Sequence, residues 1–482
     1  MNSHQFHRRD FLKTIGWGVS ATLLPGVFSC QSTKPVEKPN IIIIMADDQG
    51  YADAGCYGAE GFETPHLDKL AAEGIQFTDF YVGAPVCTPS RAALMTGCYP
   101  QRVSLPHVLG PNADTGIHAE EEILAELLQA RGYKTACVGK WHLGDQPEFL
   151  PTRHGFDTYF GLPYSNDMWP NHPTHPFPDL PLIEGDQIIE YNPDQSQLTT
   201  WYTERTVQFI KENKTQPFFI YLPHSMPHVP LFVSDKFKGK SKQGLYGDVI
   251  MELDWSVGQI MQTLQAEGLD EKTLIIYLSD NGPWLSYGNH AGSAKPLREG
   301  KATTFDGGQR VICLMRWPGQ IPAGQVRHEM ITQMDLLPTV LKLTGASLPA
   351  KAIDGSDIWP LMSNQSGAKP PHDAFYYYNG YELQAVRSGK WKLHRPHAYR
   401  SLAVPGENGM PGKYETKRTE FELYNLEVDV SEQNNVAPQH PEIVEKLKLL
   451  MDAFEKELLQ NRRVAGKIRR EGLYEYHSEP PA

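Results

Sequence analysis

The alternation of short apolar runs with amphipathic stretches, from Asn40 to about Ser363, constrains the fold of this chain more than any other feature. Two of the runs read NIIIIMADD and TLIIYLSDNG, and both are continuous and rich in β-branched residues. A strand that is apolar on both sides must be buried on both faces, which is typical of parallel strands in α/β proteins. Other stretches, such as LDKLAAEGIQF and AEEILAELLQARG, carry the charged face of a surface helix. The pattern therefore predicts an α/β domain in which helices cover both faces of a large sheet.

The sequence changes character after about Pro370. The runs AFYYYN, YELQAVRSGKWKLHR and FELYNLEVDV predict antiparallel strands, and PEIVEKLKLLMDAFEKELLQ predicts an amphipathic helix. The apolar face of this helix is formed by Ile443, Leu447, Leu450, Phe454 and Leu458. We therefore expect a large domain at 40–370 and a smaller C-terminal subdomain at 371–482, built from an antiparallel sheet and a helix.

The first thirty residues predict an export signal and not a part of the fold. They contain HRRDFLKTIGWGVSATLLPGVFSC, which resembles a twin-arginine signal and whose apolar stretch is too short for a spanning helix. The stretch ends in VFSC, which is similar to a lipoprotein cleavage box with Cys30 as the lipidated residue; cleavage without lipidation is the alternative. Residues 31–39 read as a polar tether. We therefore expect a protein of the periplasm or cell envelope, and a lipidated Cys30 would attach it to a membrane.

Charge restricts the class of partner. The chain has 482 residues and a formal net charge of −12, which argues against nucleic acid as the main partner. An acidic protein can still bind an anion where cations converge in one cleft, because the local field matters more than the net charge.

Acidic residues follow two of the apolar runs. Asp47 and Asp48 end the first run, and Asp280 and Asn281 end another. In open sheets, ligands bind at the carboxyl ends of the strands. Oxygen donors of this kind suit a hard divalent cation such as calcium or magnesium. Each Asp could instead cap the next helix or turn, but two similar pairs at strand ends favour a metal site.

Basic residues and histidines form a second group, and some of them follow other predicted strands. They are Arg91, Lys140, His142, His224, His228, Lys295, Arg298 and Lys301. Taken singly, each is better read as a surface cation or as a histidine bonded within the core. Together they would face the acidic pairs, and such an arrangement suits a tetrahedral dianion or a monoester.

The stretch CTPSRAALMTG places Cys87 at the start of a predicted helix, since Pro89 suits a first turn and Gly97 a helix end. A helix N-terminus favours negative charge, so a thiolate nucleophile is one reading. A tyrosine-phosphatase loop needs five residues between its cysteine and arginine, whereas three separate Cys87 from Arg91. The chain has six cysteines, and with Cys30 assigned to the signal the remaining five are an odd set for an oxidising compartment. One of them is therefore expected to have a separate task.

The same stretch resembles the signature of type I sulfatases, C-x-P-S-R-x-x-x-L/M-T-G, whose cysteine is converted to formylglycine. Further blocks are similar to the family in the same order, among them GYKTACVGKWHLG, LSDNGP and GKATTFDGGQRV. The resemblance runs from about Pro39 to about Gly355, and within the family it is strongest to arylsulfatase A and N-acetylgalactosamine-6-sulfatase. It implies an alkaline-phosphatase-like fold with a large mixed β-sheet flanked by helices, in which 40–370 is the catalytic domain.

The resemblance also implies a role for particular residues. Calcium would be bound by Asp47, Asp48, Asp280, Asn281 and the modified Cys87. Arg91 and Lys140 would hold and polarise the formylglycine.

Three further residues would act on the substrate. His142 and Lys301 would bind sulfate oxygens, and His142 would be the base that regenerates the aldehyde. His228 would be the acid at the leaving oxygen, with His224 as its rival. In this chemistry one hydroxyl of the hydrated aldehyde attacks sulfur and expels the alcohol; the second then loses its proton as sulfate leaves.

The expected substrate is a sulfated galactose or N-acetylgalactosamine, from a glycosaminoglycan or an algal polysaccharide. The span from about Asn166 to Gln197 predicts a long irregular excursion, which could be a binding loop or a plain surface insertion. The residues expected to read the sugar are Asp167, His172, Lys295 and Arg298. A formylglycine-generating enzyme is the expected transient partner, and it would act before a folded chain is exported.

Two alternatives remain. One is a phosphonate or phosphodiester hydrolase of the same superfamily, which can use formylglycine and a single metal. The other is a catalytically silent, lipid-anchored glycan-binding protein that has kept the fold. A two-zinc phosphatase is disfavoured, because further histidine ligands at suitable spacing are missing from the sequence.

Overall fold

The computed structural model describes residues 38–174 and 176–469, which belong to one compact unit that begins at Lys38. The predicted export signal, Cys30 and most of the predicted tether lie outside the described residues. Within the described ranges, no helix is long and apolar enough to cross a membrane.

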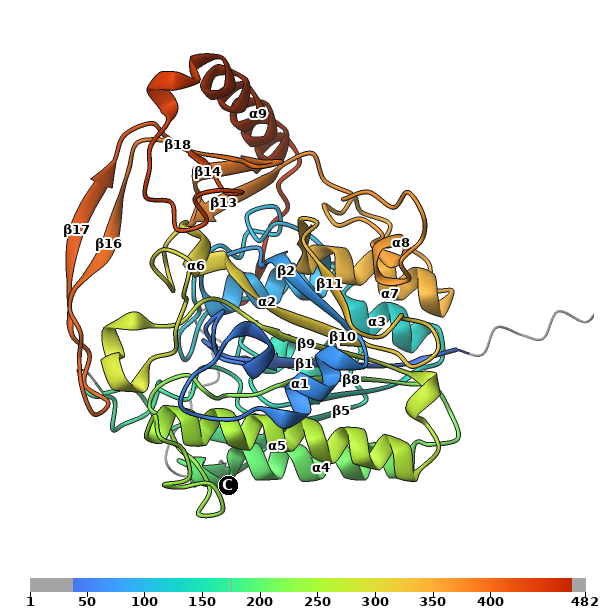
Figure 1. Ribbon diagram of the computed structural model, residues 1–482. Coiled ribbons are helices and arrows are strands. Elements are labelled where there is room, and N and C mark those ends of the chain that lie inside the picture. Colours follow the sequence, from blue (N-terminus) through green and yellow to red (C-terminus); the bar gives the residue numbers. More distant parts are fainter. Residues whose placement is uncertain (1–37, 175, 470–482) are drawn as a thin grey trace, which may run out of the picture. The chain divides into compact units, whose positions relative to one another are not determined.

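The main element of the fold is a large mixed sheet (Figure 1). In the described ranges it has eleven strands, and β12 (Ile331–Thr332) pairs with β2 beside the main path. The order along that path is β11 (Gln325–Arg327), β2 (Ile75–Tyr81), β10 (Arg310–Arg316), β9 (Thr273–Ser279), β1 (Asn40–Ala46), β8 (Phe218–Pro223), β4 (Lys134–Val138), β5 (Thr158–Gly161), β6 (Pro181–Glu184) and β7 (Gln187–Tyr191). The central strands β9, β1, β8, β4 and β5 are parallel, whereas β10 runs antiparallel to both of its neighbours.

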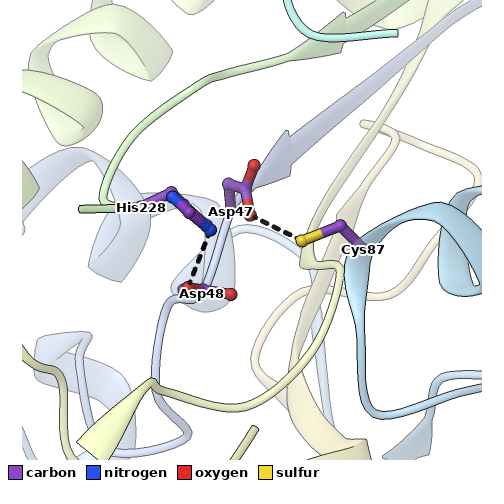
Figure 2. Close-up of side chains that lie close together, drawn as sticks. All are labelled: Asp47, Asp48, Cys87 and His228. Carbon is purple, nitrogen blue, oxygen red and sulfur yellow. Dashed lines mark hydrogen bonds and ion pairs between the residues drawn. The ribbon is translucent and has the colours of Figure 1, made fainter. Parts of the chain in front are cut away.

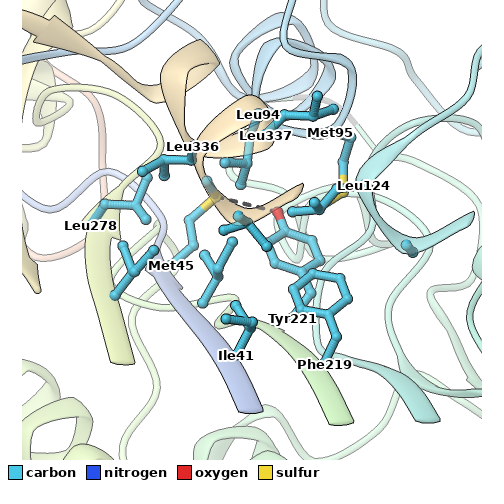
Figure 3. Packing of buried hydrophobic residues seen from close by; sticks show 14 of the residues in the cluster. Ile41, Met45, Leu94, Met95, Leu124, Phe219, Tyr221, Leu278, Leu336 and Leu337 are labelled. Carbon is cyan, nitrogen blue, oxygen red and sulfur yellow. Dashed lines mark hydrogen bonds between the residues drawn. The ribbon is translucent and has the colours of Figure 1, made fainter. Parts of the chain in front are cut away.

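The position of β1 in the middle of the sheet explains why its sequence is apolar without interruption. Ile41, Ile43 and Met45 belong to the hydrophobic cluster on one face of the sheet, and the residues between them belong to the cluster on the other face. Side chains alternate between the two faces of a strand, so a strand covered on both sides needs apolar residues at every position. Figure 3 shows the first cluster, in which Met45 packs beside Tyr221.

Helices cover both faces of the sheet (Figure 1). One face is covered by α1 (Pro65–Ala72), α4 (Leu198–Glu212) and α5 (Leu245–Ala266). The other is covered by α2 (Cys87–Thr96), α3 (Leu124–Ala130), α7 (Leu336–Thr344) and α8 (Trp359–Met362). The short helix α6 (Asp306–Gln309) leads directly into β10. The predicted large mixed sheet flanked by helices is confirmed.

The C-terminal part forms a separate, smaller antiparallel sheet, as the sequence predicted. Its strands are β13 (Phe375–Asn379), β14 (Glu382–Ser388), β15 (Trp391–His394) and β18 (Glu422–Asn425). Helix α9 (Pro441–Gln460) packs on this sheet through the apolar face predicted for it. A short pair also forms between β3 (Thr115–Gly116) and β19 (Gly466–Lys467).

The segment at 166–197 differs from the irregular excursion that its composition predicted. It contains the antiparallel strands β6 and β7, which extend the edge of the large sheet. Gly185, with φ of 62°, makes the turn between them, and the left-handed backbone there favours glycine. The polar composition reflects a hairpin at a sheet edge, where one side meets solvent, as well as the loop that precedes it.

A long hairpin extends from the small sheet toward the loops of the large one. Strands β16 (His397–Val404) and β17 (Lys413–Thr419) run along the side of the molecule at which the parallel strands end (Figure 1). The tip of the hairpin bonds to the carbonyl of Ser286 through Gly406 N at 2.9 Å and Gly412 N at 2.7 Å. A C-terminal element therefore supports the loops beyond the carboxyl ends of the central strands.

Candidate active site

The carboxylates predicted for a metal site meet at the carboxyl ends of β1 and β9. These strands pair in parallel up to Ala46 and Ser279, so the residues that follow them emerge side by side. Asp280 N donates to the Ala46 carbonyl at 3.1 Å, and Asp48 N donates to Asp280 Oδ1 at 3.1 Å. Asp47 and Asp280 are fully buried, and Asp48 is 3% exposed.

The residues present fit a hard divalent cation. Asn281 Nδ2 donates to Asp48 Oδ1 at 2.7 Å and to the Gly282 carbonyl at 2.9 Å. Its Oδ1 is buried and has no hydrogen-bond partner among the described residues, which costs about 1–3 kcal/mol unless a ligand satisfies it. One ligand atom each of Asp47, Asp48, Cys87 and His228 also lies within 4.8 Å of the others (Figure 2). Carboxylate and amide oxygens are the donors that calcium and magnesium prefer.

Cys87 begins helix α2, all of whose residues are buried. Its Sγ lies 3.5 Å from Asp47 Oδ1 and points toward it (Figure 2). Burial and the Asp47 carboxylate raise the pKa of the Cys87 thiol. The encoded side chain is therefore a neutral thiol and not the thiolate that a cysteine nucleophile requires.

Arg91 lies one helical turn after Cys87 and is completely buried. Its guanidinium donates to Asp280 Oδ2 from Nε at 3.1 Å and from Nη2 at 2.9 Å, and to Asp47 Oδ2 at 3.1 Å. Nη1 donates to the carbonyl of Lys140 at 2.6 Å. The side chain thus holds two carboxylates and the loop after β4 in one arrangement.

Lys140 and Lys301 approach the carboxylates from two directions. Lys140 Nζ contacts Asp47 Oδ2 and donates to Ser165 Oγ at 3.2 Å. Lys301 Nζ donates to Asp48 Oδ2 at 2.8 Å and lies 4.4 Å from the centre of the Trp284 ring. Burial alone would lower the pKa of Lys301, but Asp48 outweighs it and raises that pKa, so the ammonium stays charged.

Two histidines complete the site. His228 Nε2 lies 3.6 Å from Asp48 Oδ2, and burial together with Lys301 lowers the pKa of His228 to about 3. The second histidine, His142, has a left-handed backbone with φ of 62°, and its Nε2 lies 2.9 Å from the Leu109 carbonyl. Its Nδ1 is buried without a hydrogen-bond partner in the described part of the chain. Burial, followed by Lys140 and Arg91, lowers the pKa of His142 well below its usual value.

The charges of the site nearly balance. Three buried carboxylates and three buried cations meet there, counted over the described residues: Asp47, Asp48, Asp280, Arg91, Lys140 and Lys301. Buried charges are tolerated when they are paired and hydrogen-bonded. A bound divalent cation would leave the site positively charged, and an anionic ester would then restore the balance.

Sequence reasoning missed Ser165. Its Oγ accepts from Lys140 and lies 3.4 Å from the ring nitrogens of His228, so it bridges two of the predicted residues. The residue follows strand β5, which is parallel to β4. Applying the strand-end rule to the TYFGLPYS stretch would have found it.

The residues predicted to read the sugar are only partly brought together. Asp167 is 7% exposed, and its carboxylate is close enough to His228 to oppose in part the lowering of the pKa of that ring by burial and Lys301. His172 Nε2 lies 3.8 Å from Asp167 Oδ2, and Lys295 is exposed on the loop after Ser293. Asp167 therefore lies near His228 and His172 lies near Asp167, whereas the described contacts connect Lys295 to Ser293 and not to a residue of the site.

Arg298 is held elsewhere, against the C-terminal elements. It donates to Tyr399 Oη at 2.9 Å, to Tyr424 Oη at 3.2 Å and to the Glu432 carbonyl at 2.8 Å. His224, the rival of His228, lies against helices α4 and α5, where its Nε2 is 3.4 Å from Ser256 Oγ. The geometry therefore places His228, and not His224, beside the carboxylates.

Comparison with known proteins identifies the family of the chain. The chain matches the family described as Sulfatase over residues 39–346, and the one described as N-sulphoglucosamine sulphohydrolase, C-terminal, over residues 300–457. It is 40% identical to arylsulfatase A of Bos taurus over 86% of this chain and 88% of that protein. It is also 40% identical to N-acetylgalactosamine-6-sulfatase of Canis lupus familiaris, over 74% of this chain and 72% of that protein.

A solved structure is similar over nearly the whole chain. The crystal structure of Ps i-CgsB in complex with k-i-k-neocarrahexaose superposes with a TM-score of 0.72 at 29% identity, and covers 90% of this chain and 96% of that one. Fold and site thus define a sulfuric ester hydrolase. The chain belongs to the sulfatase family, and the predicted resemblance is confirmed.

Proposed function

We propose that this sulfatase hydrolyses sulfate monoesters of a sulfated saccharide, with a formylglycine made from Cys87 and a bound calcium ion. The observation that carries the proposal is the position of Cys87. Its Sγ lies at a helix N-terminus, 3.5 Å from a metal-site carboxylate, within a group of three buried cations counted over the described residues. A neutral buried thiol has no other evident use there.

The residues fit both groups that the family implies. Asp47, Asp48, Asp280 and Asn281 would hold the cation, which would supply positive charge beside the reacting sulfate. A formylglycine at position 87 would supply a hydrated aldehyde, whose hydroxyl attacks sulfur.

The chain itself supplies the electrostatic part of catalysis. Lys140 and Lys301 are buried ammonium groups on two sides of the carboxylates, where they can bind the oxygens of a sulfate group. Fixed charges in a site closed to water stabilise developing negative charge more strongly than they would in solution. Arg91 keeps the carboxylates oriented and itself needs no reorganisation during the reaction.

The two histidines would transfer protons during the reaction. His142 has a buried Nδ1 that is free of hydrogen bonds among the described residues and can accept a proton from position 87. His228 lies against Asp48 and Ser165. Burial and Lys301 keep its pKa low, and the negative charge of a bound ester would raise that pKa so that the ring can carry a proton to the leaving oxygen. A general acid is needed because a sugar alkoxide is a poor leaving group.

The saccharide part of the proposal rests on the relatives. One of them is named for N-acetylgalactosamine 6-sulfate chemistry, and one similar structure holds a neocarrahexaose. We infer a sulfated galactose or N-acetylgalactosamine unit as the substrate. Export to the periplasm or cell envelope, lipid attachment through Cys30 and modification by a formylglycine-generating enzyme belong to the same proposal, and the first thirty residues support them.

The proposal is tested with purified chain that has been co-produced with a formylglycine-generating enzyme. Initial rates are measured on a panel of sulfated mono- and disaccharides and on the matching phosphate and phosphonate esters. We expect sulfate release from galactose-type esters at least about a hundredfold faster than phosphate release, a difference of about 2.7 kcal/mol in activation free energy. Faster hydrolysis of phosphonate esters would replace the proposal by the phosphonate hydrolase alternative.

A further inference from the structure

A cavity beside the loop that contacts His142 has no part in the chemistry described so far. Its volume is about 480 Å³, which is in the range of small-ligand pockets. It is lined by four parts of the chain: the loop after α2 at 104–109, Thr115 on β3, the turn between β13 and β14, and the chain around β19. The pairing of β3 with β19 fixes two of these walls relative to each other.

The wall from the β13–β14 turn presents an exposed aromatic ring. Tyr381 is 45% exposed, and its ring stands edge to face with His107 at 5.7 Å between ring centres. Gly380 has φ of 59°, and a side chain there would come within 2.7 Å of the His107 ring. Gly380 also accepts a hydrogen bond from Gln101 Nε2 at 2.7 Å, which fixes the turn. The turn is therefore fixed, and it holds the exposed Tyr381 ring at the wall of the cavity.

The charge around the cavity is opposite to that of the protein. Lys467 lines it and is exposed, and the Arg462 guanidinium lies 5.4 Å from the centre of the Tyr381 ring. Of the described residues that line the cavity, none is acidic, although the chain has a net charge of −12. A flat aromatic face flanked by cations matches a ligand that has both an apolar face and negative charge.

One residue connects the cavity to the active site. Leu109 lines the cavity, and its carbonyl lies 2.9 Å from His142 Nε2. Its amide donates to Thr88 Oγ1 at 3.2 Å, directly after Cys87. Leu109 thus lies between the cavity and the active-site residues, and an oligosaccharide whose ester lies at Cys87 would extend past it to reach the cavity.

We propose that this cavity binds a neighbouring, negatively charged sugar unit of the same oligosaccharide whose sulfate ester lies at Cys87. The Tyr381 ring packs against the apolar face of that sugar, and Lys467 and Arg462 bind its sulfate or carboxylate. The inference rests on the proposed saccharide substrate and adds to it a preference for anionic oligosaccharides over sulfated monosaccharides.

The test compares Tyr381→Ala and Lys467→Ala with the wild-type enzyme on a sulfated monosaccharide and on a sulfated tetrasaccharide. We expect each variant to raise KM for the tetrasaccharide at least about fivefold, and to leave kcat/KM for the monosaccharide within about twofold. Added salt should weaken tetrasaccharide binding in the wild type and less so in Lys467→Ala. The matched controls are Phe421→Ala, an exposed ring with Lys448 at 5.2 Å, and the exposed Lys238→Ala.

Several outcomes would overturn the inference while leaving the sulfatase proposal intact. One is an unchanged tetrasaccharide KM in both variants; another is an equal loss on both substrates. A chain that ends at Arg469 should keep the wild-type KM, because the cavity is assigned to substrate and not to residues 470–482. Failure of the wild type on every sulfated saccharide would instead contradict the proposed function itself.

Discussion

At the scale of single residues, position 87 decides what this site can do. As a thiol it is neutral and buried, because desolvation and the neighbouring Asp47 oppose its ionisation. The surrounding cations donate hydrogen bonds to carboxylates and not to the thiol: Arg91 bridges Asp47 and Asp280, and Lys140 contacts Asp47. Such a setting is suited to a hydroxyl nucleophile that the chain does not encode, which is why modification of Cys87 is central to the account.

Ser165 gives the first prediction at this scale. Its Oγ accepts from the Lys140 ammonium at 3.2 Å, and a hydrogen bond to a charged group contributes about 1.5–3 kcal/mol. Ser165→Ala should therefore lower kcat on a sulfated sugar by about ten- to a hundredfold, with a smaller change in KM. Ser256→Ala, which removes a hydroxyl beside His224, is the matched control and should stay within about twofold. An unchanged kcat in Ser165→Ala would show that the hydrogen bond from Lys140 to Ser165 does not contribute to catalysis.

At the scale of secondary-structure elements, the hairpin β16–β17 supports the loop that carries Lys301. Arg400 Nη2 donates to the Lys301 carbonyl at 2.9 Å, and Ser401 Oγ donates to Glu299 Oε1 at 2.7 Å. Glu299 and Ala302 both have a left-handed backbone, with φ of 58° and 64°. Non-glycine residues persist in that conformation only where the surroundings hold them. The hairpin therefore positions Lys301 from outside the catalytic sheet.

Replacing Arg400 tests this role. Arg400→Ala should lower kcat/KM by about tenfold, because the loop that carries Lys301 loses a charge-assisted hydrogen bond. As a positioning residue, Arg400 should be partly replaced by lysine, so Arg400→Lys should recover part of the loss. The control is Arg418→Ala, on the paired strand at an exposed position. Equal rates in Arg400→Ala and Arg418→Ala would contradict the role.

The start of helix α7 gives a prediction on pH. His372 Nε2 lies 2.6 Å from Asp335 Oδ1, and Asp335 also accepts from Thr332 N at 2.7 Å ahead of the helix. Burial alone would lower the pKa of His372, but Asp335, with Asp354 and Asp373, outweighs it and raises that pKa. The pair therefore stabilises the fold fully below the unfolded pKa of about 6.5, and this contribution disappears as the pH rises through the folded pKa.

The measurement is the thermal midpoint of the wild type and of His372→Gln between about pH 5 and pH 9. The wild type should exceed the variant most at the acid end, and the difference should shrink as the pH rises. His440→Gln, at an exposed ion pair with Glu442, should show little pH dependence. A difference in thermal midpoint between the wild type and His372→Gln that grows as the pH rises would contradict this prediction.

At the scale of the whole molecule, buried charges join the two sheets. Lys392 on β15 is fully buried and lies 2.8 Å from Asp306 Oδ1 and 2.8 Å from Glu432 Oε1. Nearby, Arg387 on β14 lies 2.6 Å from Asp79 on β2. The small sheet is thus held to the catalytic sheet by paired charges, as well as by apolar contacts.

Lys392→Met tests this connection, because it leaves two buried carboxylates without their lysine. Removing one partner of a buried ion pair costs about 3–5 kcal/mol, so the free energy of unfolding should fall by about that amount. Lys390→Met removes an exposed partner of Glu427, 3.7 Å away, and should change stability by less than about 1 kcal/mol. The two variants are compared by denaturant unfolding. A similar small effect in both would assign the cohesion of the sheets to apolar packing alone.

Much of this arrangement could be predicted from local sequence. The buried strands β1 and β9 were recognisable because both of their faces are apolar, and the polar residues that follow them had to emerge at one edge. Ser165 and the partners of Arg298 were not predictable in this way. Arg298 is bonded to Tyr399 and Tyr424, more than a hundred residues later, and a contact of that range depends on how the small sheet packs.

The central claim is that Cys87 is the precursor of the working residue. It is tested most directly by the mass of the proteolytic peptide that contains position 87, measured on the same preparation whose sulfate release is assayed. The account predicts that the peptide carries formylglycine, that the rate rises in proportion to the modified fraction, and that Cys87→Ala releases no sulfate. Sulfate release at full rate from a preparation in which position 87 is entirely unmodified cysteine would contradict it.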